Sequence, residues 1–252
     1  PIPTVPLTMT GGHPNDPGYQ SQHPPPLKTI AHGDSRLMTL AMNDNDRVAA
    51  SPNERAVCPG CGDEVIAKCG TINRWHWAHR NRDCDSWSEP ETDWHLDWKE
   101  KFPREWREVA IGCHRADVVT NDGVIEFQHS SISADEILKR ESFYRQMVWV
   151  LDASGFRRNI EHRRRGKYDS FRWKTPRKSW WHSGGHRHTR VSIYLDYGYS
   201  RLFLIRKLYA NIPCGGWGTW VSRGSFISRY APPGWDSELC VDAVNLPDGW
   251  TN

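Results

Sequence analysis

The chain has 252 residues, an apolar fraction of 37% and a formal net charge of +3 at pH 7. This length suffices for one domain of ordinary size plus a small appendage, but a charge this small does not by itself indicate a nucleic-acid partner. No apolar run reaches the roughly 18 residues of a membrane-spanning helix, and we expect no secretion signal because no charged start precedes an apolar block.

The first 50 residues are rich in proline. They contain PIPTVP, HPNDPG and HPPP, a composition that resists regular structure. We therefore expect an extended tail or a set of turns over residues 1–50, with a short strand near Leu37–Met42.

A small zinc-binding module is predicted over residues 51–88. The CPGC run at 58–61 and the HWAH run at 76–79 supply two pairs of ligands, which suit a tetrahedral, structural zinc ion. The predicted ligands are Cys58, Cys61, His76 and His79. Cys69 and Cys84 are further candidates, and which cysteine and histidine complete the set stays open. The seven cysteines do not form a disulfide framework, so we expect a reducing, cytoplasmic setting.

Residues 89–156 predict a core of α-β-β-β-α-β order with a mixed sheet. In its first helix, Trp94, Trp98 and Phe102 recur every four residues and share one face, and Pro103 ends the helix. A capping box at Ser133 and Glu136 begins the second helix. The expected elements are a helix over Glu91–Phe102, strands over Arg107–Ile111, Arg115–Thr120 and Val124–His129, a helix over Ser133–Met147 and a strand over Val148–Leu151.

The two middle strands of this core carry a pair of carboxylates. Asn121-Asp122-Gly123 is a tight-turn signal, and a hairpin centred on it brings Asp117 close to Glu126. Because alternate residues of a strand share a face, Glu126 and Gln128 project together, whereas Ile125 and Phe127 point into the core. Two carboxylates on neighbouring strands suit a hard cation such as Mg²⁺ or Mn²⁺, which can activate water and stabilise charge on a phosphate.

A polar stripe borders the apolar face of the first helix. Glu91, His95 and Lys99 lie at positions i, i+4 and i+8. This spacing is typical of a helix beside an active site, and it is equally typical of an ordinary solvated helix face. The spacing alone favours the second interpretation.

Residues 157–252 predict a basic, tryptophan-rich β extension that packs on the core. Cations mixed with aromatic rings suit a nucleic acid, although like-charge runs are also common in solvated loops. The predicted nucleic-acid-binding residues are Arg163, Arg164, Arg165, Lys167, Arg172, Lys174, Arg177 and Lys178. Expected strands are Val191–Tyr197 and Arg201–Lys207, which form a hairpin, then Trp217–Val221 and Ser225–Tyr230.

From Cys58 to Asp152 the chain resembles the competence protein CoiA-like family, whose members resemble PD-(D/E)XK nucleases. The matching motifs follow the family's order: CPGC at 58–61, HWAH at 76–79, ETDWHLDWK at 91–99, RADVV at 115–119, IEFQHSSIS at 125–133, and Arg140 with Tyr144 leading into WVLD at 149–152. Each motif is weak alone, but the set is specific.

The resemblance implies a restriction-endonuclease-like core and a set of catalytic residues: Glu91, His95, Lys99, Asp117, Glu126 and Gln128. Asp117 and Glu126 would bind the catalytic Mg²⁺ or Mn²⁺. The wider superfamily usually has a lysine where this chain has Gln128, and a neutral amide cannot supply positive charge to a transition state. Lys99 would take that part.

The sequence therefore predicts a metal-dependent deoxyribonuclease with a structural zinc ion. A module that binds DNA without cleaving it is the alternative, and a zinc protein that presents its tryptophans to a protein partner is a third reading. DNA is the expected partner, a membrane is not, and a homodimer stays open.

Overall fold

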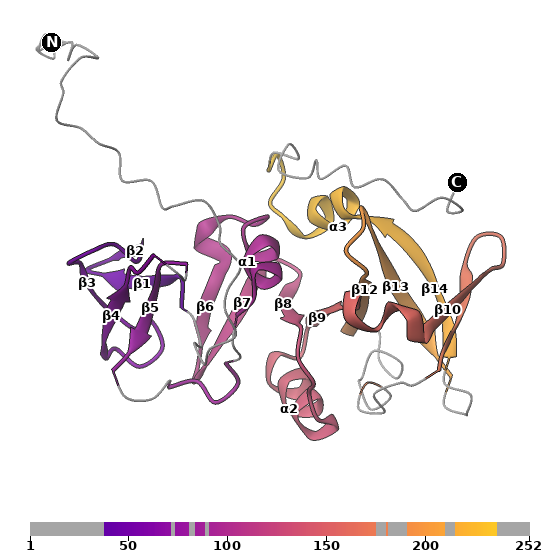
Figure 1. The fold of residues 1–252 in the computed structure, drawn as a ribbon, viewed down its shortest axis with the longest axis horizontal. Helices are drawn as coiled ribbons and strands as arrows, with labels where there is room; N and C mark the ends of the chain where they lie inside the picture. Colours follow the sequence, from indigo (N-terminus) through magenta and orange to yellow (C-terminus); the bar gives the residue numbers. More distant parts are fainter. Residues whose placement is uncertain are drawn as a thin grey trace, which may run out of the picture.

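The fold is known from a computed structural model. It describes residues 38–71, 74–80, 84–88, 91–174, 180, 191–209 and 215–235. In these ranges the strands form a small five-stranded sheet and a nine-stranded sheet, which lie side by side in Figure 1. None of the described helices is long and apolar enough to span a membrane.

The small sheet is antiparallel and has the strand order β2-β1-β3-β4-β5. Its strands are β1 (Leu40–Asn43), β2 (Asp46–Ala49), β3 (Arg55–Val57), β4 (Glu64–Lys68) and β5 (His76–His79). Trp77 and Met38 are fully buried in its core. The sheet thus begins at Leu40 and not at residue 51, because β1 and β2 complete its hydrophobic core. The proline-rich stretch before Met38 lies outside the described residues.

The next segment runs helix, three strands, helix, strand; its first helix is shorter than the predicted Glu91–Phe102 and leaves both of these residues outside it. Its elements are α1 (Asp93–Lys99), β6 (Arg107–Ile111), β7 (His114–Thr120), β8 (Gly123–Gln128), α2 (Ala134–Tyr144) and β9 (Met147–Asp152), with a short 3-10 turn η1 (Arg104–Trp106) after α1. Gly123 is required at the β7–β8 turn: its φ is +122°, and a Cβ there would lie 2.4 Å from the Gln146 carbonyl oxygen.

The large sheet is mixed. It joins β6–β9 to β10 (Ile160–Arg164), β11 (Asp169–Trp173), β12 (Val191–Asp196), β13 (Arg201–Leu208) and β14 (Gly215–Ser222), in the order β10-β11-β14-β13-β12-β9-β8-β7-β6. β9 pairs in parallel with both β8 and β12, and the remaining pairs are antiparallel. Helices cover both faces. Ile125 and Phe127 pack with Trp98 of α1 and Phe226 of α3, which confirms the predicted inward side of β8. Ile137 of α2 packs on the opposite face.

The C-terminal part extends the same sheet. After a 3-10 turn η2 (Ser154–Asn159), it contains β10 (Ile160–Arg164), β11 (Asp169–Trp173), β12 (Val191–Asp196), β13 (Arg201–Leu208), β14 (Gly215–Ser222) and α3 (Arg223–Tyr230). The β12–β13 hairpin and β14 agree with the sequence prediction.

One predicted strand is wrong: Ser225–Tyr230 belongs to helix α3. The hydroxyl of Ser222 accepts a hydrogen bond from the Ser225 backbone N–H and caps the helix. Phe226, Ile227 and Tyr230 then fall on one helical face and are buried against the sheet. The sequence signal for this helix is the Ser222 cap followed by apolar residues at helical spacing. The strand prediction overlooked that signal.

Candidate active site and metal centre

Three thiols and one imidazole gather beside the small sheet. The ligand atoms of Cys58, Cys61, His79 and Cys84 all lie within 4.8 Å of one another. The Cys58 and Cys84 sulfurs are 3.6 Å apart, and Cys61 Sγ is 3.4 Å from His79 Nε2. This Cys3His donor set is compatible with a zinc ion, which prefers thiolate and imidazole ligands in tetrahedral geometry.

His76, one of the four predicted ligands, does not join the described cluster. His76 and His79 are three positions apart on β5, so their side chains leave opposite faces of the strand. His76 is buried, and its Nδ1 lies 2.8 Å from the Arg74 carbonyl oxygen. Cys84, one of the two further candidates in the sequence, occupies the fourth position, whereas Cys69 lies outside the cluster.

Two thiols of this cluster, those of Cys61 and Cys84, have raised pKa values, mainly because they are partly desolvated. Burial, reinforced by the neighbouring Cys58 thiol, raises the pKa of Cys84 to about 12. A zinc ion binds thiolates, so its arrival would displace the thiol protons and remove the repulsion between the sulfurs.

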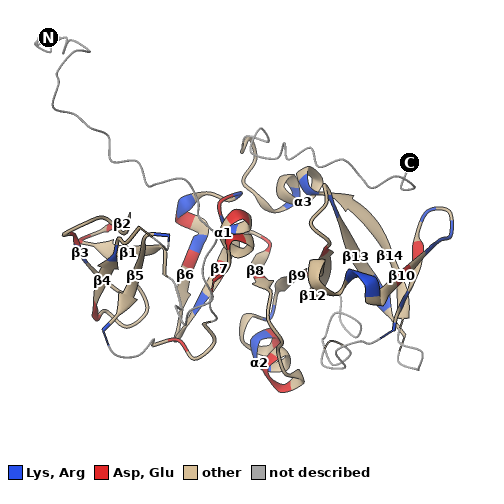
Figure 2. Ribbon diagram, viewed as in Figure 1, with Lys and Arg blue, Asp and Glu red and all other residues tan. Residues whose placement is uncertain are grey.

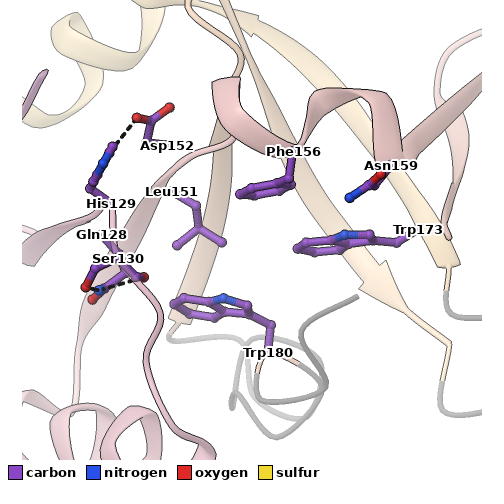
Figure 3. Close-up of a pocket in the computed structure, with 9 residues that line it drawn as sticks. All are labelled: Gln128, His129, Ser130, Leu151, Asp152, Phe156, Asn159, Trp173 and Trp180. Atoms are coloured by element: carbon purple, nitrogen blue, oxygen red, sulfur yellow. Dashed lines mark hydrogen bonds and ion pairs between the residues drawn. The ribbon is translucent and has the colours of Figure 1, made fainter. Parts of the chain in front are cut away.

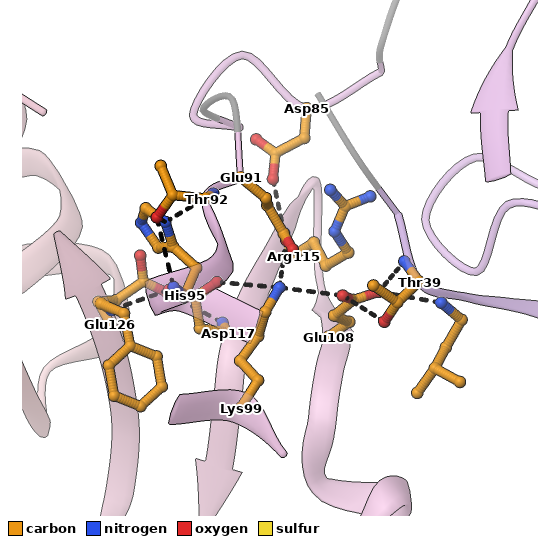
Figure 4. A network of polar contacts seen from close by, with 12 residues as sticks. Thr39, Asp85, Glu91, Thr92, His95, Lys99, Glu108, Arg115, Asp117 and Glu126 are labelled. Atoms are coloured by element: carbon orange, nitrogen blue, oxygen red, sulfur yellow. Dashed lines mark hydrogen bonds and ion pairs between the residues drawn. The ribbon is translucent and has the colours of Figure 1, made fainter. Parts of the chain in front are cut away.

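Asp117 and Glu126 meet where β7 and β8 separate. The last paired positions of the two strands are Val118 and Ile125. Just beyond them, side chains replace the backbone ladder: Phe127 N donates to Asp117 Oδ2 at 2.8 Å, and Asp117 N lies 3.4 Å from Glu126 Oε1. The predicted approach of the two carboxylates therefore occurs in the structure (Figure 4).

Glu126 is buried and is held from the other side by α2. Arg140 Nη1 donates to Glu126 Oε2 at 3.0 Å, and Arg140 also contacts Glu136 and the Trp87 carbonyl oxygen. Burial, together with the Asp117 carboxylate, raises the pKa of Glu126 to about 8 even though Arg140 opposes this shift.

Lys99 is the positive centre of the site. Its ammonium group is buried among three carboxylates: Glu91, in direct contact, Glu108 at 2.9 Å and Asp117 at 3.8 Å. Burial lowers the pKa of Lys99, but the three carboxylates outweigh it and raise this pKa overall. Burial also raises the pKa of Glu91 to about 7, against the pull of Lys99.

Glu108 is a member of this network that sequence reasoning missed. Its carboxylate accepts hydrogen bonds from Lys99, from Thr39 N and Oγ1, and from Leu40 N. Burial would raise its pKa, but Lys99 and the other donors hold it at about 2. Glu108 thereby connects the small sheet to the carboxylate cluster. Its φ of +50° is unusual for a non-glycine residue, and no local sequence signal marks it.

His95 lies inside the site as a neutral ring. Its Nδ1 accepts from the Thr92 backbone N–H at 3.2 Å, which completes the capping box of α1. Burial lowers the pKa of His95 to about 4, and a hydrogen bond with the Phe127 backbone connects the ring to β8. His95 therefore fixes the start of α1 against the carboxylate strand.

A small cavity of about 40 Å³ opens among these groups. Its lining residues are Trp87, Ser88, Glu91, His95, Arg115, Asp117, Glu126, Phe127 and Arg140. Within the described chain, Glu91 Oε2 is buried without a hydrogen-bond partner. Carboxylate oxygens around a space of this size fit a hard divalent cation with bound water.

Gln128 does not line this cavity. Although Gln128 and Glu126 leave β8 on the same face, the Gln128 amide turns away and donates to the Ser130 carbonyl oxygen at 3.2 Å. It lines a second, larger cavity instead. The structure thus brings together five of the six predicted catalytic residues: Glu91, His95, Lys99, Asp117 and Glu126.

The predicted nucleic-acid-binding residues form part of a hairpin. Arg163 and Arg164 lie on β10, Arg172 lies on β11, and Arg165 and Lys167 occupy the turn between the strands. These side chains are exposed, and Figure 2 shows their blue segment at the outer edge of the large sheet. Lys174 pairs with Glu161 at 2.5 Å. Arg177 and Lys178 lie outside the described residues.

Two family models match the chain. Residues 41–86 match the competence protein CoiA N-terminal domain, and residues 110–185 match the competence protein CoiA nuclease-like domain. The first match covers the small sheet and its Cys3His cluster, and the second begins in β6 and includes Asp117 and Glu126. No curated protein and no solved structure matches the chain.

Proposed function

Because the chain belongs to the competence protein CoiA-like family, we propose that it is a metal-dependent deoxyribonuclease of the PD-(D/E)XK type. The observation that carries this proposal is that Asp117 and Glu126 line one cavity at the point where β7 and β8 separate, with the Lys99 ammonium group 3.8 Å from Asp117 Oδ1. The succession of α1, three antiparallel strands, α2 and a parallel strand supports the same assignment.

Asp117 and Glu126 would hold Mg²⁺ or Mn²⁺, and the spare oxygen of Glu91 would assist them. Such an ion supplies an activated water and stabilises charge on the phosphate. A cation held here would favour the ionised form of Glu126, whose pKa is raised to about 8 by burial and by Asp117. Arg140 can then keep Glu126 oriented through its other carboxylate oxygen.

Lys99 would provide the positive charge that a superfamily lysine usually supplies from the position of Gln128. Its ammonium group reaches the site from α1 and is 3.8 Å from Asp117 Oδ1. Its raised pKa keeps it charged throughout the physiological range. Lys99→Ala should then reduce turnover while Mn²⁺ still binds, and an unchanged rate would contradict this role.

The basic β10–β11 hairpin would guide DNA to the site. Its exposed arginines and lysine present positive charge at one edge of the sheet that carries Asp117 and Glu126. Cations of this kind contact phosphates without reading sequence, so they favour DNA of any sequence and make binding sensitive to salt.

A second candidate function is DNA binding without cleavage. It is favoured by the ion pair between Arg140 and Glu126 and by the position of Lys99, because both cations already neutralise the carboxylates that a metal ion would need. Gln128 also lies away from the cavity.

Cleavage assays separate the two functions. The full chain is incubated with Mg²⁺ or Mn²⁺ and with single-stranded, double-stranded and branched DNA, beside Asp117→Ala, Glu126→Ala and the surface control Lys139→Ala on α2. A nuclease cleaves at least one DNA form, and both carboxylate variants reduce the rate more than about 100-fold while the control does not. Binding of DNA with no cleavage of any form would establish the second function.

A further inference from the structure

An aromatic cavity of about 150 Å³ lies beside the carboxylate site. Its lining residues are Gln128, His129, Ser130, Leu151, Asp152, Phe156, Asn159, Trp173 and Trp180. A cavity of roughly 150 Å³ accepts a single six-membered aromatic ring. The nuclease chemistry described above makes no use of this space.

The walls of the cavity are suited to a flat ring. Phe156 and Trp173 stack on each other, with centroids 5.3 Å apart and planes within 8°. Figure 3 shows this pair on one side of the cavity and Trp180 on the other, with Leu151 beside them. Trp180 is itself fixed by an edge contact with the buried Trp149 at 5.2 Å. Rigid aromatic walls on two sides favour stacking of a planar guest.

Polar groups occupy the remaining border. The carboxamides of Gln128 and Asn159 and the hydroxyl of Ser130 line the cavity, and His129 Nδ1 is 2.7 Å from Asp152 Oδ2. Carboxamides both donate and accept, and they pair with the edges of nucleobases in protein–DNA complexes.

The cavity is adjacent to the carboxylate site along β8. Gln128 lines the aromatic cavity and Glu126, two residues earlier on the same face of the strand, lines the carboxylate cavity. The ring of His129, which lines the aromatic cavity, lies 6.0 Å from the ring of His95 on α1, which lines the carboxylate cavity. Glu126 and Gln128 are two positions apart on one strand, so they are separated by roughly 7 Å, which is about the length of one nucleotide.

We propose that this cavity receives one unpaired base of a DNA strand whose neighbouring phosphate lies in the carboxylate cavity. The inference rests on the proposed function for the identity of the strand, and it adds a substrate class: DNA with at least one unstacked base near the cleaved bond. Such a base would be drawn from a single strand, an end or a flipped position, where it is free to stack on protein rings.

The test compares two DNA strands of equal length and charge. One is an abasic 12-nucleotide strand, and the other is the same strand with a single thymine at its centre. Affinity is measured by fluorescence anisotropy with the full-length Asp117→Asn protein, so that cleavage does not interfere. The thymine strand should bind about 10-fold more tightly, in line with the stacking energy of one base. Because the strand has only one base, only one alignment of the strand on the protein places a base in the cavity.

Two variants ask whether the base occupies this cavity. Phe156→Ala removes one stacking wall, whereas Asn159→Phe fills the space with a protein ring. Both should abolish the advantage of the thymine strand while leaving the affinity for the abasic strand unchanged. Tyr209→Ala, at an exposed ring outside both cavities, should retain the advantage. Equal affinities for the two strands, or an advantage that survives both cavity variants, would overturn the inference.

Cleavage of ordinary single-stranded DNA by the unchanged chain is recorded in parallel. A thymine advantage without any Mg²⁺- or Mn²⁺-dependent cleavage supports the base cavity and rejects the nuclease. Cleavage without a thymine advantage supports the nuclease and rejects the base cavity.

Discussion

The two polar clusters of this chain are built in opposite ways. Cys58, Cys61, His79 and Cys84 come from one short stretch of sequence and lie near the surface, with Cys61 and Cys84 exposed. The carboxylate cluster draws its members from α1, β6, β7 and β8 and buries most of them.

Their charge balance differs as well. The Cys3His cluster consists of three thiols and an imidazole, and burial raises the pKa of its Cys84 thiol. The carboxylates already have a cation, since Lys99 contacts three of them and Arg140 contacts Glu126. We infer that the first cluster would depend on a bound zinc ion for its stability, whereas the second is organised by the ion pairs of the fold itself.

The clusters are joined at two points. Glu108 accepts hydrogen bonds from Thr39 and Leu40 at the start of the small sheet. Asp85, directly after Cys84, accepts from Arg115 N at 2.7 Å and lies 2.8 Å from His114 Nδ1. Loss of zinc should therefore also disturb the carboxylate site.

The largest expected effect follows zinc removal. A chelator should unfold the small sheet, because structural zinc contributes on the order of 10 kcal/mol in small domains. Calorimetry with and without the chelator measures the loss, and Cys61→Ser should reproduce it. Cys113→Ser, at an exposed thiol outside the cluster, serves as the control. An unchanged unfolding profile after complete zinc removal would refute the structural role.

Removal of Lys99 should have the next largest effect. Lys99→Met leaves Glu91, Glu108 and Asp117 facing one another in a buried space, so the free energy of unfolding should fall by about 3–5 kcal/mol. Chemical denaturation measures this difference. Lys139→Met on the exposed face of α2 should change stability by less than about 0.5 kcal/mol. If both variants were equally stable, the charge balance described above would be incorrect.

Substitutions of Cys84 and of His76 should have different effects on zinc binding. Cys84→Ser should weaken zinc binding about 100-fold or more, because it removes a ligand atom, whereas His76→Gln should leave the zinc content at one ion per chain. Metal analysis after competition with a chromogenic chelator measures both. Weaker zinc binding by His76→Gln together with an unchanged zinc content in Cys84→Ser would instead support His76 as a ligand, as the HWAH motif predicts.

The smallest effect is a pH dependence of the carboxylate site. Glu126 has a pKa of about 8, above its ordinary 4.5, so the metal-free fold loses stability as pH rises from 4.5 to 8. A cation binds the deprotonated form, so its affinity should rise with pH up to about 8, by at most tenfold per unit. Calorimetric titration with Mn²⁺ in two buffers of different ionisation enthalpy detects the released proton. Affinity independent of pH between 6 and 8 would contradict a role for Glu126 as ligand.

Local patterns predicted much of the fold. Trp94 and Trp98 lie on α1 as predicted, although the helix ends at Lys99, before Phe102, and the Asn-Asp-Gly turn sets the hairpin that brings Asp117 to Glu126. The limits of such patterns are equally specific. Cys84 completes the Cys3His cluster although the HWAH motif favours His76, because strand geometry separates the two histidines of the motif.

Contacts between distant segments were beyond sequence reasoning. Glu108 lies in an ordinary strand pattern, and its role depends on Thr39, which is 69 residues away. The rotation of Gln128 toward Ser130 and the packing of Phe156 against Trp173 likewise depend on the assembled sheet. For α2, the sequence predicted the Ser133 cap but not the ion pair between Arg140 and Glu126.

Crystals soaked in Mn²⁺ provide the most direct test of two metal sites with different chemistry. Anomalous diffraction at the zinc and manganese edges identifies each ion by its position. The account predicts zinc bound by Cys58, Cys61, His79 and Cys84, and manganese bound by Asp117 and Glu126. Manganese at another position, or a carboxylate cavity that stays empty at saturating Mn²⁺, would contradict it.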